Sequence, residues 1–277
     1  MTAPGLRTAL AVLLALLPGC GDRAAAPPAG PPALQFASLS ADPVVRGERL
    51  GRVLGCRGCH GNDLTGRGWI EEPEVALLFT SNLTRSVPEY GDAQLARAIR
   101  LGVRHDGSPL WEMPSDIFTD LGEADMAALI AWLRTLAPAG EAHPRIAIGP
   151  EGRRLIASGE VRPAPAVARD NRAKAPPRLD GRHDWARYMI RATCGECHGV
   201  ELTGHEGTED QPGPPDLIVA GAYTREQFRH LLRTGEAMGG RQLGLMADVA
   251  RGRFAFLTER EADAIYDYLI ARAQQPQ

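Results

Sequence analysis

One eleven-residue pattern occurs twice in this chain and constrains its fold more than any other feature. Residues 56–66 read CRGCHGNDLTG and residues 194–204 read CGECHGVELTG. Both copies contain a CxxCH motif, in which a histidine directly follows the second of two cysteines, and both continue to LTG. The copies lie 138 residues apart in a chain of 277. That length favours two domains of about 100 to 150 residues, so the repetition predicts two similar domains, each built around one motif.

Helix-like apolar periodicity flanks each motif. Upstream, residues 43–55 place apolar side chains on one helical face after Asp42 as the N-cap, and residues 184–192 repeat the pattern. Downstream, residues 117–136 and 256–273 each have a polar start followed by apolar residues with a period of about 3.6. Each repeat is therefore predicted to open and close with an amphipathic helix, and no β-sheet of consequence is expected.

The predicted fold is all-α, with two tandem domains joined by a proline-rich linker. The linker, residues 138–182, contains seven prolines and at most one short helix, around residues 152–158. The predicted segments are a lipoprotein-type signal peptide at 1–20, a flexible tether at 21–39, a first domain at 40–137, the linker, and a second domain at 183–275.

The N-terminus has the pattern of an export signal. Arg7 precedes an apolar run over residues 9–17, and small residues lead to Cys20. This run is far shorter than the roughly 20 residues of a membrane-spanning helix, so export is favoured. The stretch LPGC resembles a bacterial lipoprotein signal, with Cys20 as the lipid-attachment residue, although Pro18 departs from that pattern. A lipid anchor at the periplasmic face of a bacterial membrane is expected, and a plain secretory signal cut near Cys20 is the alternative.

Two cysteines and an adjacent histidine are compatible with three kinds of chemistry. A structural zinc site draws about four ligands from separate pairs, so the two motifs would have to pool their cysteines. A redox dithiol of the thioredoxin type needs a βαβ context, whereas helices are predicted here. In a c-type haem site, two thiols add to the haem vinyl groups and the histidine ligates the iron. An exported, repeated motif favours haem.

Two haem c groups are therefore predicted. Their covalent attachment residues would be Cys56, Cys59, Cys194 and Cys197, and their histidine ligands His60 and His198. Aromatic residues make up only 5% of the chain, against 31 glycines and 22 prolines. This composition indicates small packing units that a large cofactor would help to fill.

A methionine is expected as the second axial ligand of each iron. Met113 lies in the loop before the first closing helix and is the candidate in the first repeat. The second repeat offers Met238 and Met246. Met113 precedes Trp132 of its closing helix by 19 residues, whereas Met246 precedes the matching Tyr268 by 22 and Met238 by 30. The spacing favours Met246, with Met238 as the alternative.

These features together resemble the small class I cytochrome c domain, here in tandem over residues 40–137 and 183–273. The stretch SNLTRSVPEYGDAQLARAIRLGVRHDGSPLWEMP is similar to cytochrome c subunits of membrane-bound alcohol, aldehyde and gluconate dehydrogenases. Those subunits carry three haems, whereas this chain has two CxxCH motifs. The resemblance implies that a loop carbonyl accepts a hydrogen bond from each haem histidine. These carbonyls would belong to Ser81 for His60 and Pro215 for His198.

Electron transfer is the function that this pattern favours, without catalysis. Two His/Met haems would pass electrons between an extracytoplasmic donor dehydrogenase or reductase and an acceptor such as a terminal oxidase or soluble cytochrome. The net charge of −3 argues against a nucleic-acid partner. The alternatives are a haem enzyme with an open second haem, such as a dihaem peroxidase or small-molecule dehydrogenase, and a redox sensor or structural haem subunit of a respiratory complex.

Overall fold

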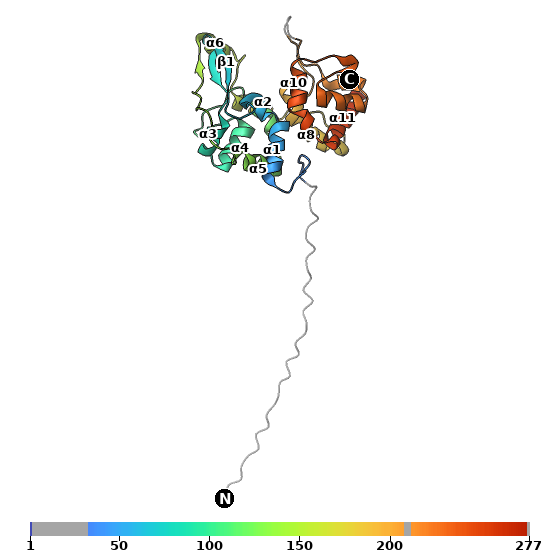
Figure 1. Ribbon diagram of the computed structural model, residues 1–277, viewed down its shortest axis with the longest axis horizontal. Helices are drawn as coiled ribbons and strands as arrows, with labels where there is room; N and C mark the ends of the chain where they lie inside the picture. Colours follow the sequence, from blue (N-terminus) through green and yellow to red (C-terminus); the bar gives the residue numbers. More distant parts are fainter. Residues whose placement is uncertain (2–32, 208–211, 276–277) are drawn as a thin grey trace. The chain divides into compact units, whose positions relative to one another are not determined.

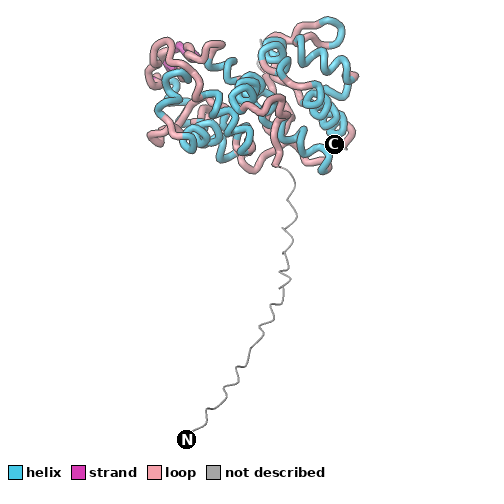
Figure 2. Tube along the Cα trace, turned by 60° about the horizontal axis from the view of Figure 1, so that its bottom comes forward, coloured by secondary structure: helices cyan, strands magenta, loops and turns pink. Residues whose placement is uncertain are grey.

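The computed structural model describes Met1 and residues 33–207 and 212–275, and the chain from Ala33 onward forms one compact unit. Helices dominate the described residues (Figures 1 and 2), which confirms the predicted mainly helical fold. The α-helices are α1 (Pro43–Val53), α2 (Cys56–His60), α3 (Leu83–Ser86), α4 (Asp92–Leu101), α5 (Glu123–Leu133), α6 (Pro150–Ser158), α7 (Ala164–Asp170), α8 (Asp184–His198), α9 (Arg225–Thr234), α10 (Leu245–Gly252) and α11 (Glu259–Ala273). Short 3₁₀ helices span Val87–Glu89, Ser115–Phe118, Gly181–His183, Leu217–Ala222, Met238–Gly240 and Phe254–Phe256.

The two repeats use the same order of elements. In the first, α1 and α2 lead into and through the motif, α4 follows, and α5 closes the repeat. In the second, α8 contains the motif, α9 follows, and α11 closes (Figure 1). Helices α4 and α9 end alike, at Gly102 and Gly235, whose φ angles of 67° and 77° are left-handed. Glycine at this position is the usual helix stop, so both turns into the methionine loops are set by the sequence.

The opening helix is interrupted in the first repeat and continuous in the second. Gly55 has a φ of 84° and separates α1 from α2. Its counterpart Thr193 lies inside α8, where its hydroxyl donates to the Met189 carbonyl at 2.9 Å. A left-handed conformation costs glycine little free energy, so the helix can break at Gly55. The first motif therefore occupies a separate short helix, whereas the second motif ends a long one.

A small antiparallel sheet forms where no sheet was expected, from two strands between the first motif and α3 and a third strand after α5. Strands β1 (Gly68–Glu72), β2 (Ala76–Phe79) and β3 (Ala147–Ile148) pair in the order β1-β2-β3. Ala76 and Leu78 of β2 are buried while Leu77 is exposed. This alternation is that of a strand with one covered face, but it is too short to be distinctive in the sequence.

The segment between the repeats covers part of the first repeat. Helix α6 lies where a short helix was expected, whereas α7 was not predicted. The backbone N–H of Ala164 in α7 donates to the Leu110 carbonyl at 2.9 Å, and the Asn171 amide donates to the Asp116 carboxylate at 2.8 Å. Because Leu110 and Asp116 flank Met113, α7 braces the methionine loop from outside.

Two glycines allow α1 to pack closely against α5. A Cβ atom added at Gly47 would collide with the Ala128 carbonyl oxygen, and one added at Gly51 would collide with the Trp132 ring. The absent side chains therefore let the two backbones approach, and they leave room for the indole between the helices.

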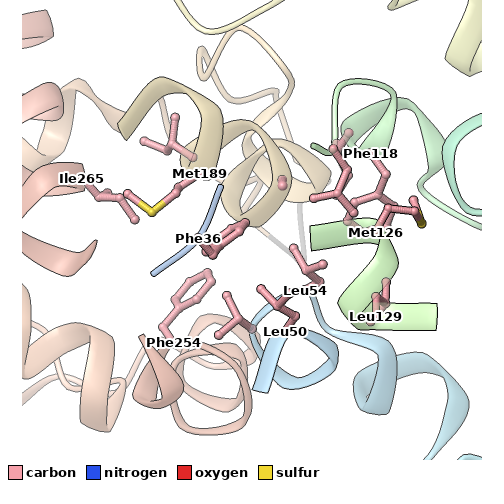
Figure 3. Close-up of a cluster of buried hydrophobic side chains, with 14 of the residues drawn as sticks. Phe36, Leu50, Leu54, Phe118, Met126, Leu129, Met189, Phe254 and Ile265 are labelled. Carbon is pink, nitrogen blue, oxygen red and sulfur yellow. The ribbon is translucent and has the colours of Figure 1, made fainter. Parts of the chain in front are cut away.

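The cores of the two repeats meet around Phe36, which is fully buried. Figure 3 shows Phe36 among side chains from both repeats, with Leu50 and Phe254 on one side and Met189 on another. Its ring lies 5.7 Å from that of Tyr188, centroid to centroid. Phe36, which precedes α1, therefore belongs to the core of both repeats.

Two buried carboxylates stabilise the seam, the region around Phe36 where the cores of the two repeats meet. Asp125 accepts hydrogen bonds from the Phe36 backbone N–H at 2.8 Å and from the Tyr188 hydroxyl at 2.6 Å. Glu261 pairs with Arg49 at 2.9 Å, joining α11 to α1. Both acids lie in the first turn of a closing helix, where the helix dipole favours negative charge. A buried carboxylate is tolerated when it is well paired in this way.

Candidate haem-binding sites

The first motif is carried on α2, and its histidine is held by a loop carbonyl. The Nδ1 atom of His60 lies 2.8 Å from the Ser81 carbonyl oxygen, so Nδ1–H donates and Nε2 is left to bind a metal. Burial lowers the pKa of His60, and the hydrogen bond to Ser81 opposes this effect. The neutral imidazole, which is the form that ligates metals, is thereby favoured.

The second motif repeats this arrangement at the end of α8. The Nδ1 atom of His198 lies 2.7 Å from the Pro215 carbonyl oxygen, and burial again lowers the histidine pKa as the largest effect. Ser81 and Pro215 are thus the hydrogen-bond partners that the resemblance implied. Both histidines have one nitrogen fixed and the other directed away from that partner.

The loop after each histidine has the same backbone path. The N–H of Gly66 donates to the His60 carbonyl at 2.8 Å, and that of Gly204 donates to the His198 carbonyl at 2.9 Å. Both glycines have left-handed φ angles, 79° and 69°. A Cβ at Gly204 would strike the Pro214 carbonyl. The glycine of the shared LTG sequence is therefore required for the loop to return to the backbone of its histidine.

The four motif cysteines are partly buried thiols and are not joined in disulfides. Burial raises the pKa of Cys56 and of Cys194 to about 11. Within residues 33–207 and 212–275, no group of three or more His, Cys, Asp or Glu side chains is arranged to hold a metal ion.

One cavity brings the predicted residues of the first site together. Cys56, Cys59, His60 and Met113 all line it, and it encloses about 1240 Å³ including its opening to solvent. Its lining is largely apolar, with contributions from Leu83, Val87, Leu95, Ile99, Phe118 and Leu129. An apolar cavity with a few polar groups is typical of a cofactor site.

Met113 is half-buried against the core and lies next to left-handed Glu112, whose φ is 59°. Glu112 is not a residue type that adopts this conformation readily, so the surrounding structure holds the loop in place. Met126, the other methionine of this region, is 2% exposed and packs among core side chains (Figure 3). The structure thus sets Met113 in the cavity and Met126 in the core.

The second methionine loop matches the first residue for residue. An isolated β-bridge pairs Val103 with Pro109 in the first repeat and Glu236 with Gln242 in the second. Four residues after each bridge lies a methionine, Met113 or Met246. The hydrogen bonds within the two turns also correspond, each running from the residue after the first bridge residue to the residue before the second.

The structural match separates Met246 from Met238. Met246 is half-buried and packs against the core, whereas Met238 is 41% exposed at the tip of the turn. Met238 corresponds in position to His105 of the first repeat, whose ring makes an edge contact with Tyr90 at 4.8 Å. Met246 differs from Met113 in one respect, because it lies in the first turn of helix α10 rather than in a loop.

Arg104 is a residue of the first cavity that the sequence pattern did not single out. It lines the cavity with Tyr90, and burial lowers its pKa while Tyr90 and a nearby acid oppose this. The chain is rich in arginine, and nothing in the order of residues distinguishes this one.

The family model for cytochrome c matches residues 44–137 and 186–271, well over half of the chain. The chain belongs to the cytochrome c family. Members bind haem c covalently, and the residues present fit that group: two thiols, a histidine with Nε2 available and a methionine line one apolar cavity. Membership indicates electron transfer by haem c.

Cytochrome subunits of dehydrogenases are among its relatives. The chain is 25% identical to the fructose dehydrogenase cytochrome subunit of Gluconobacter japonicus over 271 residues, or 84% of this chain and 53% of that protein. It is 24% identical to the alcohol dehydrogenase (quinone) cytochrome c subunit of Gluconacetobacter polyoxogenes, over 80% of this chain and 53% of that protein. It is 24% identical to the gluconate 2-dehydrogenase cytochrome c subunit of Pantoea cypripedii, over 85% of this chain and 62% of that protein.

These matches confirm the expected likeness to cytochrome c subunits of alcohol and gluconate dehydrogenases. This cytochrome spans about half the length of the fructose and alcohol dehydrogenase subunits that it matches. Cys20, the predicted lipid-attachment residue, and the predicted signal peptide lie outside the described residues. Among those that are described, no helix is long and apolar enough to cross a membrane.

Proposed function

We propose that this cytochrome carries electrons through two covalently attached haems, one in each repeat. The equivalence of the two sites is the main support: each CxxCH histidine has a carbonyl partner on Nδ1. Each repeat also has a methionine four residues after its β-bridge. The thiols of Cys56 and Cys59 would bind the first haem, and those of Cys194 and Cys197 the second.

His60 and Met113 would be the axial ligands of the first iron, and His198 and Met246 those of the second. Ser81 and Pro215 would hold the imidazole rings in orientation and raise their basicity. A bound haem supplies reversible one-electron chemistry, and methionine as a ligand tends to raise its potential. Because all axial positions would be filled by side chains, small molecules would be kept from the metal, which favours a carrier over a catalyst.

Arg104 and Tyr90 would serve the first haem as polar partners within an apolar cavity. The carboxylates of haem are anionic, and a half-buried guanidinium favours an anion near it. Leu95, Ile99 and Leu129 on the lining would exclude water from the ring.

The proposed donor is a dehydrogenase, because the relatives are cytochrome subunits of dehydrogenases. The acceptor would be a terminal oxidase or a soluble cytochrome. The proposed location is the periplasmic face of a bacterial membrane, with Cys20 as the lipid-modified residue; fractionation and a Cys20→Ser variant, which should release the protein, test this part.

Optical and magnetic spectroscopy of the full-length haem protein tests the proposal. Two low-spin haems are expected, with the methionine-to-ferric-iron charge-transfer absorption, and reduction should be reversible at both. A high-spin second haem together with peroxidase turnover would replace the carrier function by that of a haem enzyme.

A further inference from the structure

Arg253 lies between the two CxxCH motifs, although it belongs to neither. It follows α10 and precedes Phe254, which packs beside Leu50 in the shared core (Figure 3). The whole residue is 8% exposed. An arginine is seldom buried unless it is paired, so its partners indicate what it does.

The guanidinium contacts the residues that lead into both motifs. Its Nη2 donates to the Leu54 carbonyl at 3.3 Å and to the Thr193 carbonyl at 3.5 Å. Leu54 precedes Cys56 by two residues, and Thr193 directly precedes Cys194. Its Nε atom also lies 3.4 Å from the Val53 carbonyl. One side chain thus holds the end of α1 and the turn of α8 that carries the second motif.

Two further contacts show that this fit is close. A Cβ atom at Gly55 would lie 2.6 Å from the Arg253 guanidinium carbon, so the glycine between α1 and α2 makes room for the charge. Nη1 of Arg253 pairs with the Glu196 carboxylate at 2.8 Å. Glu196 lies between the two cysteines of the second motif and also lines the first cavity, so this ion pair reaches both sites.

These contacts place the positive charge of Arg253 between the segments that lead into the two motifs. The guanidinium meets the backbone carbonyls of Leu54 and Thr193 and the carboxylate of Glu196. A charge acts over longer distances in a poorly polarisable interior than in water, so one buried cation can influence both sites.

We propose that Arg253 is a shared positioning residue for both haem sites, joining the two attachment turns and raising the reduction potential of both haems. This inference rests on the proposed function, since it requires a haem at each motif. Reduction of a ferric haem adds one electron and removes one unit of positive charge. A fixed buried cation disfavours the ferric form, and without it Glu196 would be left as an uncompensated negative charge.

Spectroelectrochemical titration of full-length haem protein tests this inference. In Arg253→Gln both midpoint potentials should fall, with at least a tenfold change in the ferric-to-ferrous ratio at a fixed potential, which is about 59 mV for a one-electron couple. Arg253→Lys keeps the charge and should retain most of each potential. Glu196→Gln should shift both potentials upward, and it provides a readout if Arg253→Gln does not fold.

Arg49→Gln is the matched control. Arg49 is half-buried at the seam, where it pairs with Glu261 at 2.9 Å, but none of its hydrogen bonds among the described residues reaches a motif segment. Its replacement should lower stability and leave both potentials in place. Equal shifts in Arg49→Gln and Arg253→Gln, or a shift at one haem alone, would overturn the inference. A wild-type protein without two reversible couples would instead reject the proposed function.

Discussion

Met246 occupies in the second repeat the place that Met113 occupies in the first, four residues after the β-bridge that closes each turn. The two methionines are both half-buried, while Met238 is exposed at the position that matches His105. This correspondence is stronger evidence than spacing along the chain, because insertions alter spacing and leave the fold intact.

Met246→Leu should therefore open the second haem, and Met238→Leu should not. The first change removes an axial ligand, so the second haem should become high-spin or bind water and its potential should fall. Electron paramagnetic resonance and the charge-transfer absorption of the ferric protein distinguish these states. Two unaltered low-spin haems in Met246→Leu would exclude Met246 as the ligand.

The loop glycine below His198 provides a test of the carbonyl contact. Gly204→Ala places a Cβ against the Pro214 carbonyl at a left-handed φ of 69°. It should displace the Pro215 carbonyl from Nδ1 of His198, lower the potential of the second haem and cost about 2 kcal/mol or more of unfolding free energy. Urea unfolding and potentiometry measure the two effects.

Gly239→Ala is the control for this change. Its φ of 78° is equally left-handed, but no atom lies within 4 Å of the added Cβ. Only the backbone cost of about 1 kcal/mol is expected, with the haem potentials unchanged. A potential shift as large in Gly239→Ala as in Gly204→Ala would contradict the role given to the loop.

The buried carboxylate at the seam should contribute several times as much to the free energy of unfolding as an exposed carboxylate does. Asp125 is fully buried. It pairs with Arg46 and accepts hydrogen bonds from the Phe36 N–H and the Tyr188 hydroxyl. Asp125→Asn removes its charge and leaves Arg46 without its partner, which should cost about 3 kcal/mol. Asp92→Asn breaks an exposed pair with Arg134 and should cost less than about 1 kcal/mol. Similar losses in the two variants, measured by urea unfolding, would argue against a seam held by Asp125.

The ion pair between Asp216 and Arg272 should make stability depend on pH in acid. Hydrogen bonds from Arg272 are the largest cause of the lowered pKa of Asp216. With the folded pKa below the unfolded one, this stabilisation is present above about pH 4 and is lost as the pH falls through the folded value. Asp216→Asn should therefore be less stable than wild type at about pH 6, and the difference should shrink toward about pH 2. A difference that stays constant over this range would show that ionisation of Asp216 is not responsible.

Much of this architecture follows from local patterns in the sequence. The helical periods and the repeated CxxCH motif predict the paired opening and closing helices, because those signals come from neighbouring residues. The carbonyls of Ser81 and Pro215 lie at the histidines that the resemblance implied, although the separation along the chain is 21 residues in the first repeat and 17 in the second.

The remaining features depend on contacts between distant residues. Strand β2 is four residues long, which is too short for its alternation of buried and exposed residues to stand out in the sequence. Its partner β3 lies in the segment after the first repeat, far from β2 along the chain. Arg253 and Val53 are 200 residues apart, and an arginine-rich chain gives no sign of which guanidinium is buried. Such contacts form only when the two repeats pack together, so local sequence patterns do not predict them.

Intact-mass spectrometry of the purified full-length protein tests the central claim most directly. The wild-type chain should carry the mass of two covalently bound haems. Cys56→Ser with Cys59→Ser, and separately Cys194→Ser with Cys197→Ser, should each retain one. A wild-type chain with one haem or none, or a double variant that loses both haems or neither, would contradict one haem site in each repeat.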